Sequence, residues 1–114
     1  MSDISAVDEE SMAVLRDAMG EDFAELITVF IESTQEILTQ LEQAFEQQDI
    51  ESFTRHAHSL KSSSANLGGL TLSAMAAELE QGGQRQQWPE SASFILALKQ
   101  EFSRMEKELQ QYQT

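Results

Sequence analysis

The sequence contains no cysteine, one proline and five glycines among its 114 residues. Without cysteine the chain can form neither a disulfide nor a thiolate metal site. Four of the glycines occur as pairs at 68–69 and 82–83, and glycine is typical of helix ends. Residues that interrupt helices are therefore scarce and localised, which favours a largely helical chain.

Basic residues are also scarce. Seven Lys and Arg stand against 20 Asp and Glu, so the formal net charge is −13. This charge repels nucleic acid phosphates and anionic lipid headgroups, and we expect neither nucleic acid nor a membrane as a partner. No apolar run reaches the about 18 residues of a membrane span, and no signal peptide is recognisable. We therefore expect a cytoplasmic protein.

Helical periodicity organises most of the chain. Residues 1–7 lack it and are predicted to be a flexible N-terminal arm, whereas 8–114 are predicted to form a single domain. Within this domain, steps of three and four between apolar residues predict helices over about 8–19, 21–48, 50–67, from 70 or 71 to the 82–83 pair, and from 88 onward.

Sequence signals at the predicted helix ends support this division. Asp49 is a good N-cap for the third helix, and Pro89 is tolerated in the first turn of the last. Four substantial helices with short connections predict an all-α fold, an antiparallel four-helix bundle. The short first helix is predicted to cap one end of this bundle.

The third predicted helix has two distinct faces. At about 100° per residue, an arc about 80° wide forms the predicted core face, which consists of Phe53, Ala57, Leu60, Ser64 and Leu67. His58 points away from this face, with Lys61 one turn later and small residues around both. A partner can approach such a histidine closely, and Lys61 would partly neutralise an anion held there. This pattern indicates a phosphorylatable histidine.

The segment from Ala57 to Gly69, AHSLKSSSANLGG, resembles the signature of histidine-containing phosphotransfer (HPt) domains, the relay modules of multistep two-component signalling. The resemblance implies that His58 is the phosphoacceptor and that Lys61 stabilises the phosphate. It differs from the usual pattern at Ser62, where glycine is most frequent. The partners implied are the receiver domain of a hybrid sensor histidine kinase and that of a response regulator. The chain is then a monomeric carrier rather than an enzyme. It needs no cofactor, because Mg²⁺ is expected in the partner receiver only.

The resemblance also draws attention to Glu80. In HPt domains a glutamine 22 residues after the histidine often orients the imidazole, and that position holds Glu80 here. A carboxylate would be a stronger acceptor for Nδ1–H and would leave Nε2 as the attacking nitrogen. The alternative is that Glu80 is an ordinary solvated acid.

A docking surface of small residues around the histidine is a further implication of the resemblance. Small side chains near the phosphoryl group would allow close contact, and the neighbouring exposed residues would line the surface. The residues predicted for docking are Thr54, Arg55, Ser62, Ala65 and Gly69. Further candidates are Val14 or Ala18 of the first predicted helix and the outer faces of the second and third.

Two other functions fit parts of the sequence. An acidic helical adaptor or anti-factor would use the same bundle without phosphate chemistry, but it has no reason to expose the pair of His58 and Lys61. A phosphohistidine phosphatase would need a further acid or amide set or a metal site, and none is evident. His56 lies about 160° around the helix from His58 and is predicted to be a boundary residue rather than a second acceptor. At this spacing the two histidines cannot chelate a metal together.

Overall fold

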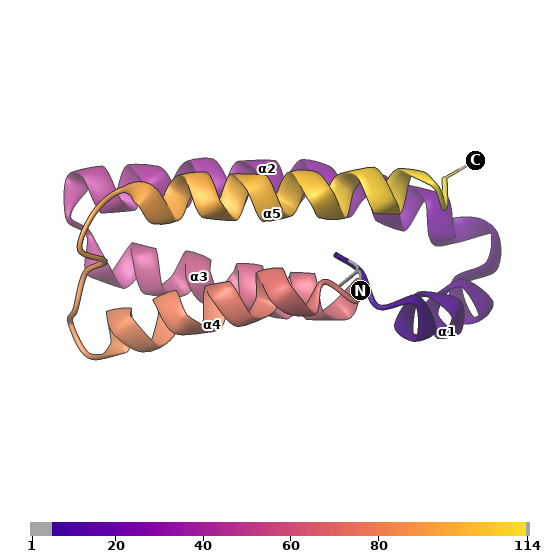
Figure 1. Ribbon diagram of the computed structural model, residues 1–114, viewed down its shortest axis with the longest axis horizontal. Helices are drawn as coiled ribbons and strands as arrows, with labels where there is room; N and C mark the ends of the chain where they lie inside the picture. Colours follow the sequence, from indigo (N-terminus) through magenta and orange to yellow (C-terminus); the bar gives the residue numbers. More distant parts are fainter. Residues whose placement is uncertain (1–5, 114) are drawn as a thin grey trace, which may run out of the picture.

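The computed structural model describes residues 6–113, which form helices joined by turns, with no strand among these residues. The helices are α1 (Glu9–Met19), a single 3₁₀ turn (Gly20–Asp22), α2 (Phe23–Gln47), α3 (Ile50–Asn66), α4 (Leu70–Gln84) and α5 (Ser93–Gln110). In Figure 1, α2 and α5 form one layer and α3 and α4 the other, with α1 beyond the end of the second layer. Contacts run around the ring from α2 to α3, α4, α5 and back to α2. The predicted four-helix bundle with a capping helix is confirmed.

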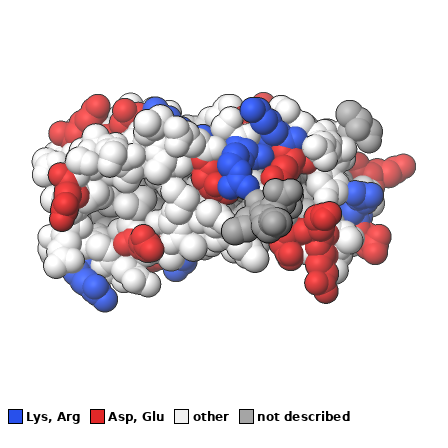
Figure 2. Space-filling model, in the orientation of Figure 1, with Lys and Arg blue, Asp and Glu red and all other residues white. Residues whose placement is uncertain are grey.

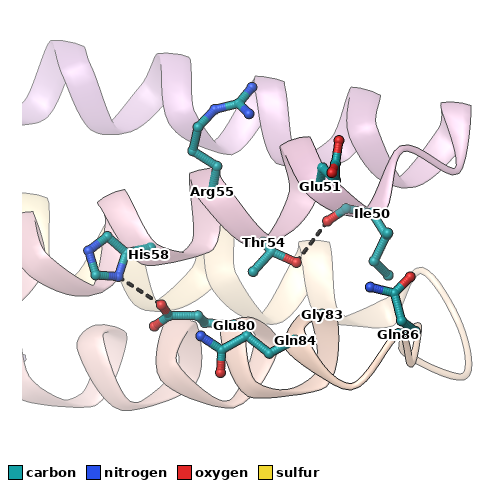
Figure 3. A pocket seen from close by; sticks show the side chains of 9 residues that line it. All are labelled: Ile50, Glu51, Thr54, Arg55, His58, Glu80, Gly83, Gln84 and Gln86. Atoms are coloured by element: carbon teal, nitrogen blue, oxygen red, sulfur yellow. Dashed lines mark hydrogen bonds and ion pairs between the residues drawn. The ribbon is translucent and has the colours of Figure 1, made fainter.

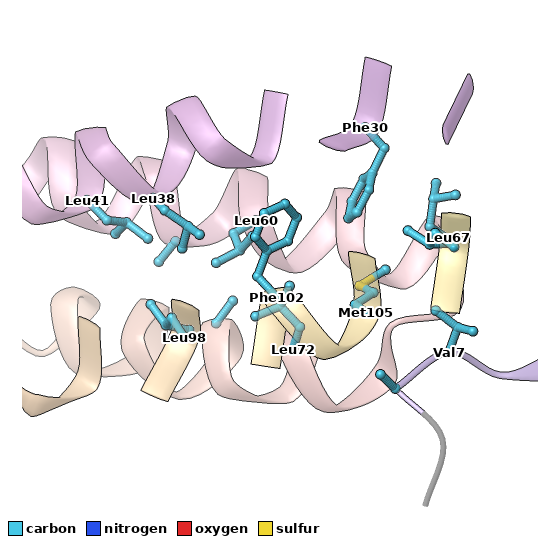
Figure 4. Packing of buried hydrophobic residues seen from close by; sticks show 14 of the residues in the cluster. Val7, Phe30, Leu38, Leu41, Leu60, Leu67, Leu72, Leu98, Phe102 and Met105 are labelled. Atoms are coloured by element: carbon cyan, nitrogen blue, oxygen red, sulfur yellow. The ribbon is translucent and has the colours of Figure 1, made fainter. Parts of the chain in front are cut away.

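The hydrophobic core lies between these two layers (Figure 4). Leu60 of α3, Leu72 of α4 and Leu98 of α5 are each at most 1% exposed. Burying one such side chain contributes about 1.5–3 kcal/mol relative to leaving it in water. All five residues of the predicted inward face of α3 are buried, which confirms that His58 belongs to the outward face.

Local hydrogen bonds set both ends of α3. The side chain of Asp49 accepts the backbone N–H three residues later at 3.2 Å, as expected for the predicted N-cap. At the other end, Gly68 has φ +74°, a left-handed conformation that glycine adopts without strain. The N–H groups of Gly68 and Gly69 donate to the carbonyls of Ala65 and Ser64 at 3.1 and 2.8 Å. These bonds end α3 and turn the chain directly into α4.

A second glycine brings α3 and α4 close together. A Cβ at Gly83 would overlap the hydroxyl of Thr54 on α3 and lie 3.0 Å from its Cβ. Only glycine allows this approach without displacing one helix. Because Glu80 precedes Gly83 by about one helical turn, the close contact also brings the Glu80 side chain up to α3.

Two residues of the predicted N-terminal arm, Ala6 and Val7, are anchored to the bundle. Ala6 and Val7 are only 1% and 2% exposed, and their N–H groups donate to the Glu108 carboxylate at 2.8 and 3.0 Å. The prediction extended the arm over these two residues because their anchor is a tertiary contact, which leaves no periodic signal in the sequence. The rest of the predicted arm, 1–5, lies outside the described residues.

The last helix begins later than predicted. It starts at Ser93 rather than at Trp88, and residues 88–92 form a connection. The Trp88 ring packs edge-on against Phe53 and Phe45, with centroids 5.0 and 5.7 Å apart. This aromatic contact holds the connection against α2 and α3, so tertiary packing overrides the helix start that Pro89 suggested.

Candidate functional site

His58 stands on the outer face of α3 with 59% of its side chain exposed. Its position follows from the helix, because neighbouring Ala57 and Leu60 turn inward and are fully buried. Figure 3 shows the imidazole ring at the edge of α3, directed toward α4 with one of its nitrogens. The predicted exposure of the histidine is therefore observed.

Glu80 reaches His58 from α4. Its Oε2 lies 2.7 Å from Nδ1 of His58, and its Oε1 lies 2.6 Å from Nζ of Lys61. The Glu80 side chain is only 10% exposed, while that of Lys61 is 36% exposed. Glu80 is thus no ordinary solvated acid: it is a largely buried carboxylate that contacts both α3 residues singled out in the sequence.

This arrangement determines the charge of Glu80 and the tautomer of His58. The hydrogen bond from Lys61 lowers the pKa of Glu80 below its ordinary value near 4.5; burial opposes this, and the hydrogen bond from His58 adds to it. An ionised carboxylate only accepts hydrogen bonds, so Nδ1 must be the donor. In the neutral ring, Nε2 then carries the lone pair. Nε2 has no hydrogen-bond partner among residues 6–113, and it is free to act as a nucleophile.

A groove of about 440 Å³ runs along α3 and α4 next to the histidine. Thr54 and Gly83 meet across it, and Gln84 contributes an amide (Figure 3). Arg55 lies at its rim and points away from Glu80 in the same view. The groove therefore leaves open space beside the ring, and its polar lining is shared by both helices.

The predicted docking residues separate into three groups. Ser62, Ala65 and Arg55 are exposed on the same side of α3 as His58, whereas Thr54 is half-buried between α3 and α4. Gly69 is buried, and a Cβ there would lie 2.5 Å from Sδ of Met105 on α5. Gly69 is thus removed from the predicted docking surface: it allows α5 to pack against the turn between α3 and α4.

An apolar groove of about 440 Å³ lies between α1, α2 and the C-terminal part of α3, where Ser63 and Asn66 line it. Leu26 and Val29 of α2 line it, and Val29 is 52% exposed. An adjoining hollow between α1 and α3 is lined by Val14, which is 67% exposed, and by Ala18. Val14 and Ala18 were candidates from the sequence. The outer face of α2 was also a candidate, although Val29 itself was not named.

The second histidine, His56, is half-buried on another side of α3. Burial lowers its pKa, and the positive charge of Arg55 lowers it further. Among the described residues no carboxylate contacts its ring as Glu80 contacts that of His58. The prediction that His56 is a boundary residue agrees with this position.

Over 6–113, no three His, Asp or Glu side chains gather closely enough to hold a metal ion. None of the described helices has the length and apolar character of a membrane span. In Figure 2, acidic side chains lie at both ends of the face seen in Figure 1, and acidic and basic side chains lie together near its centre.

The chain is similar to known proteins over most of its length. The family model of the Hpt domain matches residues 25–113. The fold is similar to that of histidine-containing phosphotransfer protein B from Pseudomonas aeruginosa PAO1, with a TM-score of 0.92, 24% identity, and coverage of 97% of this chain and 96% of that one. It is also similar to the HPT domain of a hybrid histidine kinase from Shewanella, with a TM-score of 0.75, 20% identity, and coverage of 94% and 92%. No curated protein matches the sequence.

Proposed function

Because the chain belongs to the Hpt domain family and its role is histidine phosphotransfer in phosphorelays, we propose that His58 is the residue that carries the phosphoryl group. One observation supports this assignment above all: Nδ1 of the exposed ring is held by Glu80 at 2.7 Å, which leaves Nε2 open to a partner. His56 has no comparable arrangement among the described residues. The acidic adaptor considered from the sequence is not favoured.

In the proposed reaction, Nε2 of His58 attacks the phosphorus of an aspartyl phosphate on a receiver domain. The N–P bond forms while the P–O bond to the aspartate breaks, and the electron pair of that bond stays on the aspartate carboxylate. Glu80 stabilises the positive charge that develops on the ring during attack. Phosphoryl transfer depends mainly on positioning and charge neutralisation, and the exposed ring and its buried carboxylate supply part of both.

Lys61 has two tasks in this proposal. At rest its amine holds Oε1 of Glu80 at 2.6 Å and keeps that carboxylate ionised. To stabilise a phosphoryl group on His58, the amine must turn from Glu80 toward the phosphoryl oxygens. Its 36% exposure and its position one turn after His58 leave it room to do so.

We propose that the partners are the receiver domain of a hybrid sensor histidine kinase and the receiver domain of a response regulator. Ala65, two turns after His58, lines the hollow between α1 and α3, which adjoins the apolar groove at Asn66, and Val14 and Val29 expose apolar surface there. A receiver seated on this surface would meet small side chains next to the ring. We expect a micromolar complex, because a carrier must release each partner.

Hpt carriers are not classical enzymes, and we propose that this chain has no catalytic turnover of its own. We propose that it requires no cofactor and that Mg²⁺ is supplied by the acidic pocket of the receiver. A monomeric state and a cytoplasmic location are likewise proposed.

The first prediction concerns the phosphorylated residue. After incubation with phosphorylated receiver domains, the wild-type protein should gain the mass of one phosphoryl group in an acid-labile, alkali-stable linkage. His58→Gln should reduce this transfer more than about 100-fold, because the nucleophile is lost while the exposed position tolerates glutamine. Intact mass spectrometry and the transfer rate measure both effects.

His56→Gln is the matched control for this experiment, since it removes the other histidine of α3 and should still accept the phosphoryl group. Full phosphorylation of His58→Gln would contradict the assignment. So would a wild-type protein that takes no phosphoryl group from any receiver tested or from phosphoramidate.

A further inference from the structure

We propose that Glu80 keeps a proton on Nδ1 of His58 while Nε2 carries the phosphoryl group, so that the ring leaves as a neutral imidazole when the phosphoryl group moves on. This inference rests on the proposed function, in which His58 is the phosphorylated residue. It assigns Glu80 a task beyond orienting the ring: it is a positioning residue for phosphoryl donation.

The argument begins with the chemistry of the partner on α4. Oε2 of Glu80 lies 2.7 Å from Nδ1, and the side chain is 10% exposed. A carboxylate offers only acceptors, so a deprotonated Nδ1 would place one lone pair against another. A glutamine at this position could instead turn its amide and donate N–H to a bare Nδ1. Glu80 therefore favours the protonated nitrogen, whereas glutamine would be compatible with either form.

The surrounding charges support an ionised Glu80. At rest, Lys61 of α3 contacts Oε1 at 2.6 Å and lowers the pKa of Glu80. When its amine turns toward the phosphoryl oxygens, the positively charged ring at Oε2 still favours the ionised carboxylate, so the proton stays on Nδ1 at neutral pH. The other charged side chains along this groove are Arg55 and Glu51 of α3, and α4 contributes only Glu80 among the described lining residues. Of all these groups, Glu80 is the one that contacts the ring.

Proton retention matters when the phosphoryl group departs. A receiver aspartate, or water in hydrolysis, attacks phosphorus; the Nε2–P bond breaks and its electron pair returns to Nε2. If Nδ1 carries a proton, the leaving group is neutral imidazole. If Nδ1 is bare, the leaving group is an imidazolate anion, which is far more basic and leaves much more slowly. The contact between Glu80 and Nδ1 therefore favours donation at neutral and alkaline pH.

The test compares the wild-type protein with Glu80→Gln and with Glu78→Gln. Glu78 is exposed on the same helix, so its replacement removes the same charge without touching the ring. Each protein, labelled with ¹⁵N-histidine, is phosphorylated with phosphoramidate, and ¹⁵N NMR follows the two ring nitrogens from about pH 7 to about pH 10. Free phosphohistidine serves as the reference.

We expect the phosphoryl group on Nε2 in all three proteins. In the wild type and in Glu78→Gln, Nδ1 should stay protonated at least one pH unit higher than in free phosphohistidine. In Glu80→Gln it should lose its proton as free phosphohistidine does. The hydrolysis rate should then fall about tenfold per pH unit in Glu80→Gln once Nδ1 is bare, while the wild-type rate stays level. Transfer to a receiver should follow the same profiles.

The two proposals fail in different ways. If no phosphoryl group reaches His58, the proposed function is wrong. If His58 is phosphorylated but wild-type Nδ1 loses its proton as in free phosphohistidine, the proposed function stands and the inference is overturned. Phosphorylation at Nδ1 would overturn it as well. If Glu80→Gln does not fold, the ¹⁵N spectra of the wild type, compared with those of free phosphohistidine, still show whether Nδ1 keeps its proton.

Discussion

The Glu80 carboxylate connects α4 to two side chains of α3, one through each oxygen. Oε2 accepts from Nδ1 of His58, and Oε1 pairs with Lys61. Each contact changes what the other can do, because the Lys61 amine keeps the carboxylate ionised and the ionised carboxylate selects the tautomer of His58. The tautomer of the proposed phosphoacceptor is therefore set by a residue on the neighbouring helix.

Lys61→Met should raise the pKa of Glu80, because the hydrogen bond from Lys61 is the largest cause of its lowering. A depressed carboxyl pKa stabilises the fold above the ordinary value near 4.5, and this stabilisation is lost as the pH falls through the pKa of the folded protein. We expect a loss of about 1 kcal/mol in the free energy of unfolding at pH 7, a modest value because Lys61 is partly solvated. The difference should shrink toward pH 3.

Urea unfolding at the two pH values and ¹³C NMR of the Glu80 carboxyl group measure these effects. Lys99→Met is the control, since it breaks a solvent-exposed ion pair with Glu42 and should cost less than about 0.5 kcal/mol. A loss in Lys61→Met that is independent of pH would show that packing, rather than the charge on Glu80, explains the effect.

At the scale of secondary-structure elements, the site depends on how closely α3 and α4 approach. Gly83 provides the contact, since a side chain there would collide with Thr54. The two residues lie about one helical turn from Glu80 and His58, respectively. The geometry of the site is thus built on a helix pair whose spacing one glycine permits.

Gly83→Ala should lower the free energy of unfolding by about 1–2 kcal/mol, because overpacking exceeds the gain in helix propensity. It should also reduce the transfer rate by moving Glu80 away from His58. Thermal or urea unfolding and the transfer assay test the two effects.

Gly82→Ala is the matched control for this substitution. A Cβ at Gly82 would meet only the carbonyl oxygen of Gln87, at 3.2 Å, so the change in stability should be near zero. Adding Thr54→Ala to Gly83→Ala should restore part of the loss. Equal stability of the two glycine variants would argue against close helix packing at Gly83.

At the scale of the whole molecule, the N-terminal segment ties the capping helix to the bundle. The Glu108 carboxylate of α5 accepts two backbone N–H groups, and the N–H of Asp8 donates to the carbonyl of Gly68 at 2.8 Å. The Arg16 guanidinium of α1 lies 4.9 Å from the centre of the Tyr112 ring. These contacts hold α1 beside the proposed docking surface.

Glu108→Ala should therefore destabilise the protein by about 2 kcal/mol, because the N–H groups of the buried Ala6 and Val7 lose their acceptor. Hydrogen exchange should accelerate in residues 6–12 before it does so in α3. We expect phosphorylation by phosphoramidate to be unchanged and transfer from a receiver to show a higher KM, because α1 loses its anchor.

Glu106→Ala removes the same charge two residues earlier in α5 and is the control for this experiment. Unchanged exchange rates in residues 6–12 of Glu108→Ala would contradict an anchoring role for Glu108. A parallel loss of phosphorylation by phosphoramidate would show that the substitution disturbs the His58 site itself.

The structural features that could be predicted from the sequence alone are local ones. The inward face of α3, the Asp49 cap and the exposed position of His58 follow from helical geometry within one segment, and all are found in the structure. Such features depend on residues a few positions apart, so their physical causes can be read along the chain.

The tertiary structure decided the features that join distant segments. The sequence left open whether Glu80 contacts His58. Gly69, which was predicted for docking, is buried beside Met105. The last helix begins at Ser93 rather than at Trp88, because Trp88 packs against the core. All three features depend on how the helices pack. Contacts between residues far apart in the chain leave no periodic pattern in the sequence, so they could not be predicted from it. The sequence therefore placed His58, the proposed phosphoacceptor, on the surface, and the packing of α3 against α4 brought the Glu80 carboxylate to its Nδ1.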